Sequence, residues 1–389
     1  MKRSSRPSFF KSAVSLTRGI PYLQVFCCLF VCIVAGLNPV AGPAQERAPV
    51  TIGIIAPLSQ VNADRGEEIR RTVALFEEQL RVRKLKQRYR FVFEDGRCGV
   101  GSFATTAAYK FLQQDQIRFL IAGCSGETIQ AGLLAQRHQA VLIGVLASDP
   151  AVREIGDYVF RTYVDIADGI SQIADKMKAD GRSRIAVLTE DVPFTQKIEG
   201  MLKSSLSSRI IFADTFPAST MDFDALLTKA RGLKADALYF NCAAPLTEIP
   251  LVNKARALGL RQPIYTYFMP GEPQFQEAVG KNAEGIIYVD VPDVASAAVA
   301  YQDFVTRYQQ RFAQRAIVEF LQRSTYDALT ALVNAIESAG PDAAAVRDAL
   351  YESEFEGALG RVKFDAKGDV NGLRFILRQV RNGKGVLLE

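Results

Sequence analysis

The sequence predicts an α/β protein built from two doubly wound parallel-sheet lobes joined by a hinge. Three observations support this prediction. From Val50 onward, short β-branched strands alternate with amphipathic helices, which is typical of βαβ units and a parallel sheet. The same alternation starts again after Tyr163, so the chain holds two such sets. A helical tract and two final strands then follow, and they complete the two lobes.

The first set covers residues 50–162. Its first helix is expected over residues 66–83, where Ile69, Val73 and Phe76 recur at helical spacing on one face. The expected strands are 50–57, 89–95, 118–124 and 140–146, and the other expected helices are 102–115 and 127–138.

The second set covers residues 163–290, and the rest of the chain is divided between the two lobes. The expected strands are 184–190, 209–216, 236–241 and 263–268, and the expected helices are 168–180, 195–206, 222–232 and 246–258. A helical tract over 296–351 and two strands around a turn within 361–384 come last. The predicted lobes are therefore 50–162 plus 291–355, and 163–290 plus 356–389.

Residues 1–44 have the pattern of a secretory signal. The first 22 residues carry five basic side chains and no acidic one, and an apolar segment follows over 21–37. Small residues and prolines then lead to Ala44, the predicted cleavage point, so we expect a periplasmic protein. An uncleaved membrane anchor is the alternative, because the apolar segment is about as long as the shortest spanning helices.

Removal of this segment leaves a protein with no net charge. Five of the 47 basic residues lie before residue 45, so 42 remain against 42 acidic residues. A neutral chain gives no electrostatic reason to expect nucleic acid or an anionic membrane as its partner.

Enzyme and cofactor motifs have little support in this sequence. Residues 99–104 match G-x-G-x-x-A between a strand and a helix, but no acid ends the next strand, where a dinucleotide ribose would need one. His138 is the single histidine, and hydrolase chemistry on Ser or Cys usually needs a histidine base. No metal-binding pattern occurs, so we expect no cofactor and no dedicated metal site.

Three cysteines remain after the signal segment. Cys98 follows one predicted strand and Cys124 ends the next one. Consecutive parallel strands are usually neighbours whose carboxyl ends share one edge, so the two cysteines can approach disulfide distance. A disulfide suits an oxidising compartment, and a reactive thiol is the alternative. Cys242 follows the strand 236–241 of the second set and has no evident partner.

Two serines mark a candidate binding site at this edge of the sheet. Ser125 starts a helix directly after a strand, and Ser148 follows the next strand. Open α/β sheets bind ligands at such strand ends, and amides at a helix start suit a carboxylate. Helix capping is the alternative role for each serine taken singly.

The sequence as a whole resembles the leucine/isoleucine/valine-binding family, the periplasmic receptors of branched-chain amino acid ABC transporters. The similarity runs in order over residues 50–385, and no single stretch decides it. It is carried by IGIIAPLSQVNADRGEEIRRTVALFEEQL, EDGRC, AGCSGETIQA, VLIGVLASDP, YTYFMPGEPQF, AEGIIYVDVP, STYDALTAL and GRVKFDAKGDVNG.

The resemblance implies the type I periplasmic binding protein fold and a binding function without catalysis. A monomer would capture a small amino acid or a related carboxylate or amide between its lobes and deliver it to an ABC transporter permease. Two other classes stay open: a ligand-sensing module for a regulatory partner, and an exported enzyme.

The resemblance also implies roles for individual residues. In the family a disulfide occupies the positions of Cys98 and Cys124. The ligand carboxylate lies at the positions of Ser125 and of the pair Ala147–Ser148. The remaining expected site residues are Glu272, at the position of the acid that receives the ligand ammonium, and Phe194 and Arg65, where the family has tyrosines.

Departures from the family concern the part of the site that receives the ligand side chain. The family has an aromatic residue after the strand 236–241, whereas this chain has Asn241-Cys242-Ala243-Ala244. Arg65 adds a positive charge that would admit a second acidic group. We therefore expect a retained carboxylate site and an altered side-chain pocket, which places leucine itself in question.

Overall fold

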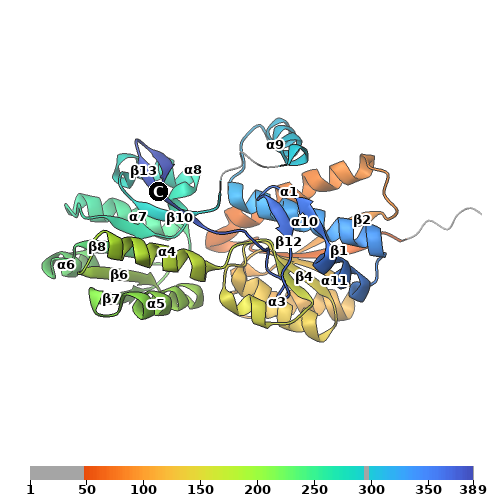
Figure 1. The fold of residues 1–389 in the computed structure, drawn as a ribbon, viewed down its shortest axis with the longest axis horizontal. Helices are drawn as coiled ribbons and strands as arrows, with labels where there is room; N and C mark the ends of the chain where they lie inside the picture. The colour runs from red at the N-terminus through yellow and green to blue at the C-terminus, as the bar shows by residue number, and fades with distance from the viewer. Residues whose placement is uncertain (1–47, 293–297, 389) are drawn as a thin grey trace, which may run out of the picture. The chain divides into compact units, whose positions relative to one another are not determined.

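The computed structural model describes residues 48–292 and 298–388. The predicted secretory signal and its anchor alternative lie outside these residues. Within the described ranges, no helix is both long and apolar enough to cross a bilayer. Figure 1 follows the chain from a first sheet, coloured orange to yellow, through a second sheet in green to teal, and back to blue helices beside the first sheet.

The first sheet consists of five parallel strands in the order β2-β1-β3-β4-β5. Every residue of FLIA in β3 and of VLIG in β4 is buried, as expected for strands covered by helices on both faces. The strands are β1 (Val50–Ala56), β2 (Tyr89–Asp95), β3 (Phe119–Ala122), β4 (Val141–Gly144) and β5 (Val159–Arg161). The helices between them are α1 (Ala63–Val82), α2 (Phe103–Tyr109) and α3 (Ser125–Arg137).

The second sheet has the order β14-β13-β10-β9-β8-β6-β7. The strands from β7 to β10 are parallel, and β13 and β14 extend one edge in antiparallel pairing. The strands are β6 (Ile185–Glu190), β7 (Ile210–Phe216), β8 (Ala237–Asn241), β9 (Ile264–Thr266), β10 (Ile287–Asp290), β13 (Ile376–Arg381) and β14 (Lys384–Leu387). The helices are α4 (Ile166–Ala179), α5 (Pro193–Leu206), α6 (Asp224–Gly232), α7 (Pro245–Ala257) and α8 (Pro273–Val279).

The parallel parts of the two sheets share one strand order. In each, the first strand pairs with the second on one side and with the third on the other, and the fourth and fifth follow outward. The strand order reverses between β1 and β3 in the first sheet and between β6 and β8 in the second. Ligands of open α/β sheets bind at this reversal, beyond the carboxyl ends of the strands.

Helices from the last quarter of the chain return to the first sheet. Helix α1 packs against α10, α10 packs against α11, and α11 contacts β4. Figure 1 shows α10 and α11 in blue beside strands of the first sheet. The elements are α9 (Val299–Phe312), α10 (Glu319–Ala339) and α11 (Ala343–Glu352).

The tail after α11 divides between the two sheets. Strand β11 (Glu354–Glu356) pairs with β12 (Arg361–Lys363), and the Arg161 amide at the end of β5 donates to the Gly368 carbonyl at 2.9 Å. Only β13 and β14 join the second sheet. The boundary between the two sheets thus falls near residue 370 of this tail, whereas the sequence predicted that all of 356–389 belongs to the second lobe. That the two lobes move as units is still a prediction.

Most strands and helices lie close to their predicted bounds, and the misses have local causes. The strands β5, β10, β11 and β14 and the helix α8 were not predicted, because segments this short give little periodic signal. The helix expected over 102–115 ends at Tyr109 and continues as a π-helical turn. The two strands expected around the turn at 365–369 belong to different sheets, and a single bridge, Phe364 to Val370, closes that turn.

Candidate functional site

The carboxyl edge of the first sheet is held together by a cysteine pair and a buried carboxyl group. The structure pairs Cys98 with Cys124, with 5.2 Å between their Cα atoms. The Cys98 amide donates to Glu127 Oε1 at 2.9 Å, and the Gly123 amide donates to Oε2 at 3.1 Å. Burial raises the pKa of Glu127 to about 8, and these amides oppose the shift. This network fixes where α3 begins.

Ser125 is the first residue of α3 and links the ends of β3 and β4. Its hydroxyl lies 3.4 Å from the Leu146 carbonyl oxygen and accepts from the Asp149 amide at 3.2 Å. Ser125 is 8% exposed and Ser148 2% exposed. The amides of Ser125 and Gly126 have no acceptor within the helix, because a helix leaves its first N–H groups unpaired. The structure thus brings Ser125, Ala147 and Ser148 together at the start of α3.

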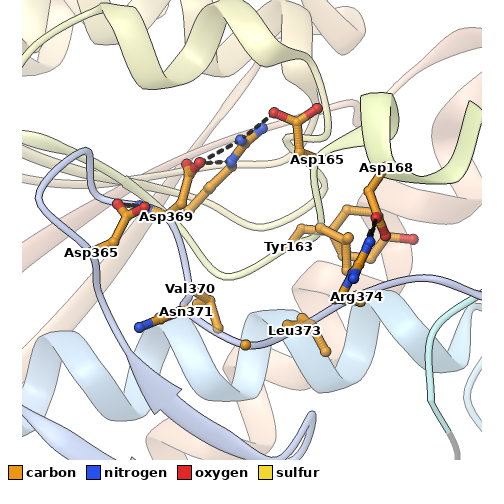
Figure 2. Close-up of a pocket in the computed structure, with 12 residues that line it drawn as sticks. Tyr163, Asp165, Asp168, Asp365, Asp369, Val370, Asn371, Leu373 and Arg374 are labelled. Atoms are coloured by element: carbon orange, nitrogen blue, oxygen red, sulfur yellow. Dashed lines mark hydrogen bonds and ion pairs between the residues drawn. The ribbon is translucent and has the colours of Figure 1, made fainter. Parts of the chain in front are cut away.

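Arg161 at the end of β5 positions the segment that follows β4. Its Nη1 donates to the carbonyl oxygens of Ala147 and Asp149 at 3.1 and 3.0 Å. Its other nitrogens bind both oxygens of Asp369 at 2.6 and 2.8 Å and one oxygen of Asp165 at 2.9 Å. Figure 2 shows the Asp165 and Asp369 carboxylates on this guanidinium. These residues line a pocket of about 210 Å³ where the chain passes between the sheets.

The opposite edge, beyond β9 of the second sheet, carries Glu272. Its Oε1 lies 3.1 Å from Arg65 Nη2, and both side chains are 2% exposed. Its Oε2 accepts from Gln274 Nε2 at 3.0 Å. Burial raises the pKa of Glu272, and Arg65 opposes that shift. Both oxygens of the expected ammonium acceptor therefore already have protein partners.

Arg65 reaches Glu272 because the first turn of α1 lies against the end of β1. A Cβ atom at Gly66 would lie 2.1 Å from the Pro57 carbonyl oxygen, so only glycine permits this approach. The guanidinium lies 5.7 Å from the centre of the Phe268 ring. Its Nη1 has no hydrogen-bond partner among the described residues, and its ion-pair contact is with Asp64 at 3.6 Å.

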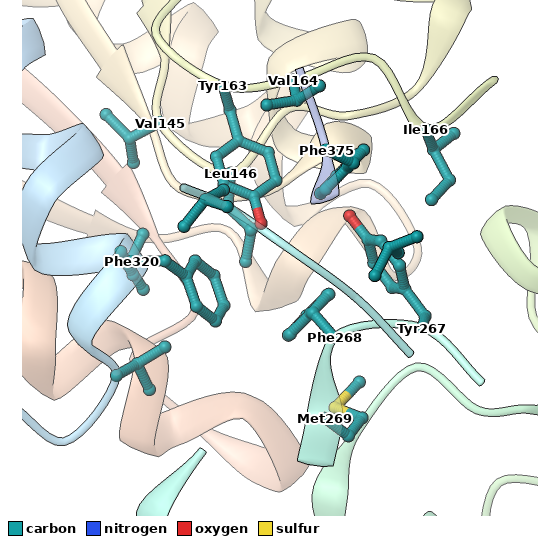
Figure 3. Close-up of a cluster of buried hydrophobic side chains, with 14 of the residues drawn as sticks. Val145, Leu146, Tyr163, Val164, Ile166, Tyr267, Phe268, Met269, Phe320 and Phe375 are labelled. Atoms are coloured by element: carbon teal, nitrogen blue, oxygen red, sulfur yellow. The ribbon is translucent and has the colours of Figure 1, made fainter. Parts of the chain in front are cut away.

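Aromatic side chains lie between the two edges (Figure 3). Phe320, at the start of α10, has its ring centre 5.6 Å from that of Tyr163 and 4.7 Å from that of Phe268. Tyr267 packs on Phe268 and lies 6.1 Å from Phe194, measured between ring centres. Figure 3 shows this cluster beside Val145 and Leu146, which follow β4. The expected residue Phe194 thus lies at the margin of an aromatic lining.

Two more polar contacts join the edges. Lys197 Nζ on α5 lies 2.6 Å from each carboxylate oxygen of Asp149. Gln274 Nε2 donates to Asp64 at 3.0 Å as well as to Glu272. Together with the Arg65–Glu272 pair, these contacts surround the predicted site. The described structure therefore has its two sheet edges in direct contact.

The second edge also buries groups that the sequence did not single out. Glu248, in the first turn of α7, is fully buried, with the Thr266 side chain close to its carboxyl group. Burial raises the pKa of Glu248 well above its ordinary value. Cys242 is unpaired and buried, and burial raises the pKa of its thiol as well.

Sequence reasoning missed the aromatic lining, although part of its signal was present. Tyr267 and Phe268 directly follow β9, at the kind of strand end where Ser125 was found. Phe320 gave no such signal, because it lies in a helix that is distant in sequence from both strands. The partner of Glu272 was missed for the same reason, since 207 residues separate it from Arg65.

Two α/β units of one strand order, with their carboxyl edges opposed, define the fold of type I periplasmic binding proteins, and solved members of that class share it. The chain belongs to the periplasmic binding protein family, whose model matches residues 49–384.

Similar proteins are found both by sequence and by structure. The leucine-specific-binding protein of Salmonella typhimurium is 25% identical over 67% of this chain and 72% of its own. The Leu/Ile/Val-binding protein BraC3 of Rhizobium johnstonii is 25% identical over 88% and 95%. A solute-binding protein of R. palustris in complex with benzoate has a TM-score of 0.77 at 21% identity, over 88% of this chain and 96% of its own. These relatives are binding proteins.

Proposed function

We propose that this chain is the extracytoplasmic solute-binding protein of an ABC transporter. It captures a small amino acid or a related carboxylate or amide between its two sheet edges and delivers it to a membrane permease. It acts in the periplasm as a monomer, after loss of residues 1–44, and it performs no covalent chemistry.

The observation that carries this proposal is the cradle formed by Ser125 and the segment after β4. Two strand ends meet there, the Ser125 hydroxyl links them, and unpaired helix amides adjoin it. Such amides and the helix dipole favour a carboxylate. Ser125, Ala147 and Ser148 are therefore the proposed carboxylate-binding residues.

The opposite edge supplies the remaining proposed contacts. Arg65 and Glu272 are buried there as a pair, and Phe194 lies beside Tyr267 at the margin. The aromatic lining between the edges suits an apolar ligand body. Similar proteins are named for leucine and for leucine, isoleucine and valine, and one was solved in complex with benzoate, so both classes of carboxylate belong in a first screen.

Binding would proceed by closure of the two lobes. The ligand would bind first to the cradle of the first sheet, and the second lobe would then rotate over it. Contacts such as Asp149–Lys197 form across the edges only when they meet. Closure would exclude water and strengthen the polar contacts to the ligand. The closed state would therefore bind the ligand more tightly than the open state, and this difference in affinity drives closure.

A thermal-shift screen over amino acids, amides, and aliphatic and aromatic acids tests this function. We expect one class of carboxylate to raise the melting temperature, because a ligand that binds only the folded state stabilises it. Ser125→Ala should weaken that shift, whereas Ser204→Ala, on an exposed face of α5, should leave it unchanged. If no member of the panel stabilises the protein, the proposed function is wrong.

A further inference from the structure

The proposed function leaves open whether the ligand carries an α-ammonium group, and the contacts of Glu272 bear on this. An ammonium ion needs an acceptor, preferably an ionised one. Glu272 is the acid at the expected place, but Arg65 lies 3.1 Å from one of its oxygens and Gln274 lies 3.0 Å from the other. Each carboxylate oxygen of Glu272 therefore already has one protein donor.

A ligand ammonium would either displace Arg65 from Glu272 or bind beside Arg65 on the same carboxylate. Arg65 is 2% exposed, and no other carboxylate lies as close to it, since Asp64 is 3.6 Å away. Removing one partner of a buried ion pair leaves the other charge unpaired and poorly hydrated, which is strongly unfavourable. Retaining the pair would instead place two cations on one carboxylate in a site with little water.

Glu190 and Glu248 are further buried acids near this edge. Glu190 already accepts from the Ala243 amide at 2.7 Å, so Glu248 is the rival acceptor for an ammonium group. It lies on α7, and its buried carboxyl resists ionisation, as its raised pKa indicates. Arg65 Nη1, by contrast, is a buried donor without a hydrogen-bond partner among the described residues. Next to the aromatic lining, Arg65 thus presents a donor, and a ligand ammonium would offer it no acceptor.

We infer that this site selects carboxylates that lack an α-ammonium group, because Arg65 occupies the acid that would receive it. The inference rests on the proposed function and narrows its ligand class. The carboxylate binds at Ser125 and Ser148, the apolar body of the ligand lies among Tyr163, Phe268 and Phe320, and the Arg65–Glu272 pair closes the far side as a neutral unit.

Matched ligand pairs that differ only in the amino group test this selection. Isothermal titration of the full mature chain would compare leucine with 4-methylpentanoate and phenylalanine with 3-phenylpropanoate. It would also compare the best carboxylate of the screen with its α-amino counterpart. We expect the acid without the amine to bind at least about ten-fold more tightly in each pair that binds. Equal or tighter binding of the amino acid overturns this inference while leaving the proposed function intact.

Variants of the Arg65–Glu272 pair distinguish a role in ligand selection from a merely structural role. Arg65→Met frees Glu272, so the preference should shift by at least about ten-fold toward the amino acid. The double variant Arg65→Met/Glu272→Gln removes both charges of this buried pair. It should fold and keep the preference for the acid without the amine. Arg81→Met, on an exposed part of the same helix, is the matched control and should change nothing.

Each remaining outcome has a defined meaning. If Arg65→Met fails to fold, the double variant and the wild-type pairs still decide the question. If the wild type prefers amino acids and Glu248→Gln abolishes that preference, Glu248 is the ammonium acceptor and the inference is wrong. If the screen finds ligands but no carboxylate among them, the inference is also wrong. If nothing binds, the proposed function fails first.

Discussion

At the carboxyl edge of the first sheet, the groups proposed to face the ligand are small and uncharged, namely serine hydroxyls and backbone amides. The edge of the second sheet presents aromatic rings, with the charged side chain of Glu272 beside them. The first edge is fixed by backbone contacts, including the carbonyl oxygens that Arg161 holds. The chemistry of the second edge depends on one side chain, Arg65, that reaches it from the other side.

This difference indicates which of the two edges determines the class of ligand. A cradle made of strand ends and helix amides accepts any carboxylate, because it recognises the group common to all of them. The second edge recognises the rest of the ligand, to which the carboxylate is attached. A single ion pair across the interface is enough to change which ligands this edge accepts. Relatives that share the first edge are thus free to differ in their ligands.

The largest effect is expected from breaking the support of the first edge at Arg161. Arg161→Met leaves the Asp369 carboxylate, 14% exposed, without its main partner. The free energy of unfolding should fall by about 3–5 kcal/mol and ligand binding should be lost, because the Ala147 carbonyl is released. Chemical denaturation and titration would measure both.

A neighbouring arginine supplies the control for this prediction. Arg153 also approaches Asp369, at 3.7 Å, but it is 38% exposed, so Arg153→Met should cost no more than about 1 kcal/mol. Adding Asp369→Asn to Arg161→Met should recover part of the lost stability. An Arg161→Met protein with wild-type stability would show that this contact does not hold the first edge.

Much of the first edge was predictable from the sequence, and little of the second was. Cys98, Cys124 and Ser125 lie within three residues of the ends of strands that hydrophobic runs reveal, so the local pattern is enough to bring them to one edge. The Arg65–Glu272 pair depends on the contact of two segments 207 residues apart, which no local pattern encodes. Glu272 was expected to be an acid facing the ligand, and its partner came only with the structure.

A smaller effect is expected from pH, through the buried acid of the first edge. Burial raises the pKa of Glu127 to about 8, so the folded protein holds this proton more tightly than the unfolded chain does. Its stabilising contribution is complete below the ordinary carboxyl pKa and is lost as pH rises through about 8. Between pH 5 and pH 8.5 the free energy of unfolding should fall by roughly 2–4 kcal/mol.

The variant Glu127→Gln tests the source of this pH dependence. It should flatten the curve measured by chemical denaturation, at an overall cost of about 1 kcal/mol because one amide loses its acceptor. Asp327 also contributes, since burial raises its pKa to about 7, so the flattening should be partial. An unchanged pH dependence in Glu127→Gln would contradict the assignment.

A third effect concerns ligand affinity alone. Ser125→Ala removes one hydroxyl from the cradle and should weaken binding by about ten-fold, which corresponds to about 1.4 kcal/mol. The unfolding free energy should change by less than about 1 kcal/mol, because the hydroxyl's longer contact, at 3.4 Å, is weak. Loss of stability without loss of affinity would make Ser125 a capping residue only.

The smallest effect is expected at the margin of the second edge. Lys197→Met removes the contact with Asp149. The Lys197 side chain is 39% exposed in this contact. Affinity should fall by no more than about five-fold, because water reaches the Lys197 end of this ion pair and screens it. Stopped-flow measurements should place the change in the dissociation rate, since the contact exists only while the edges meet. A changed association rate alone would contradict its role in closure.

A crystal structure with the tightest carboxylate from the matched pairs tests the central claim most directly. We predict that the ligand carboxylate lies within hydrogen-bond distance of Ser125 and Ser148, with Arg65 still bound to Glu272. A ligand whose carboxylate binds Arg65, or whose amine has displaced Arg65 from Glu272, would contradict the division of roles between the two edges.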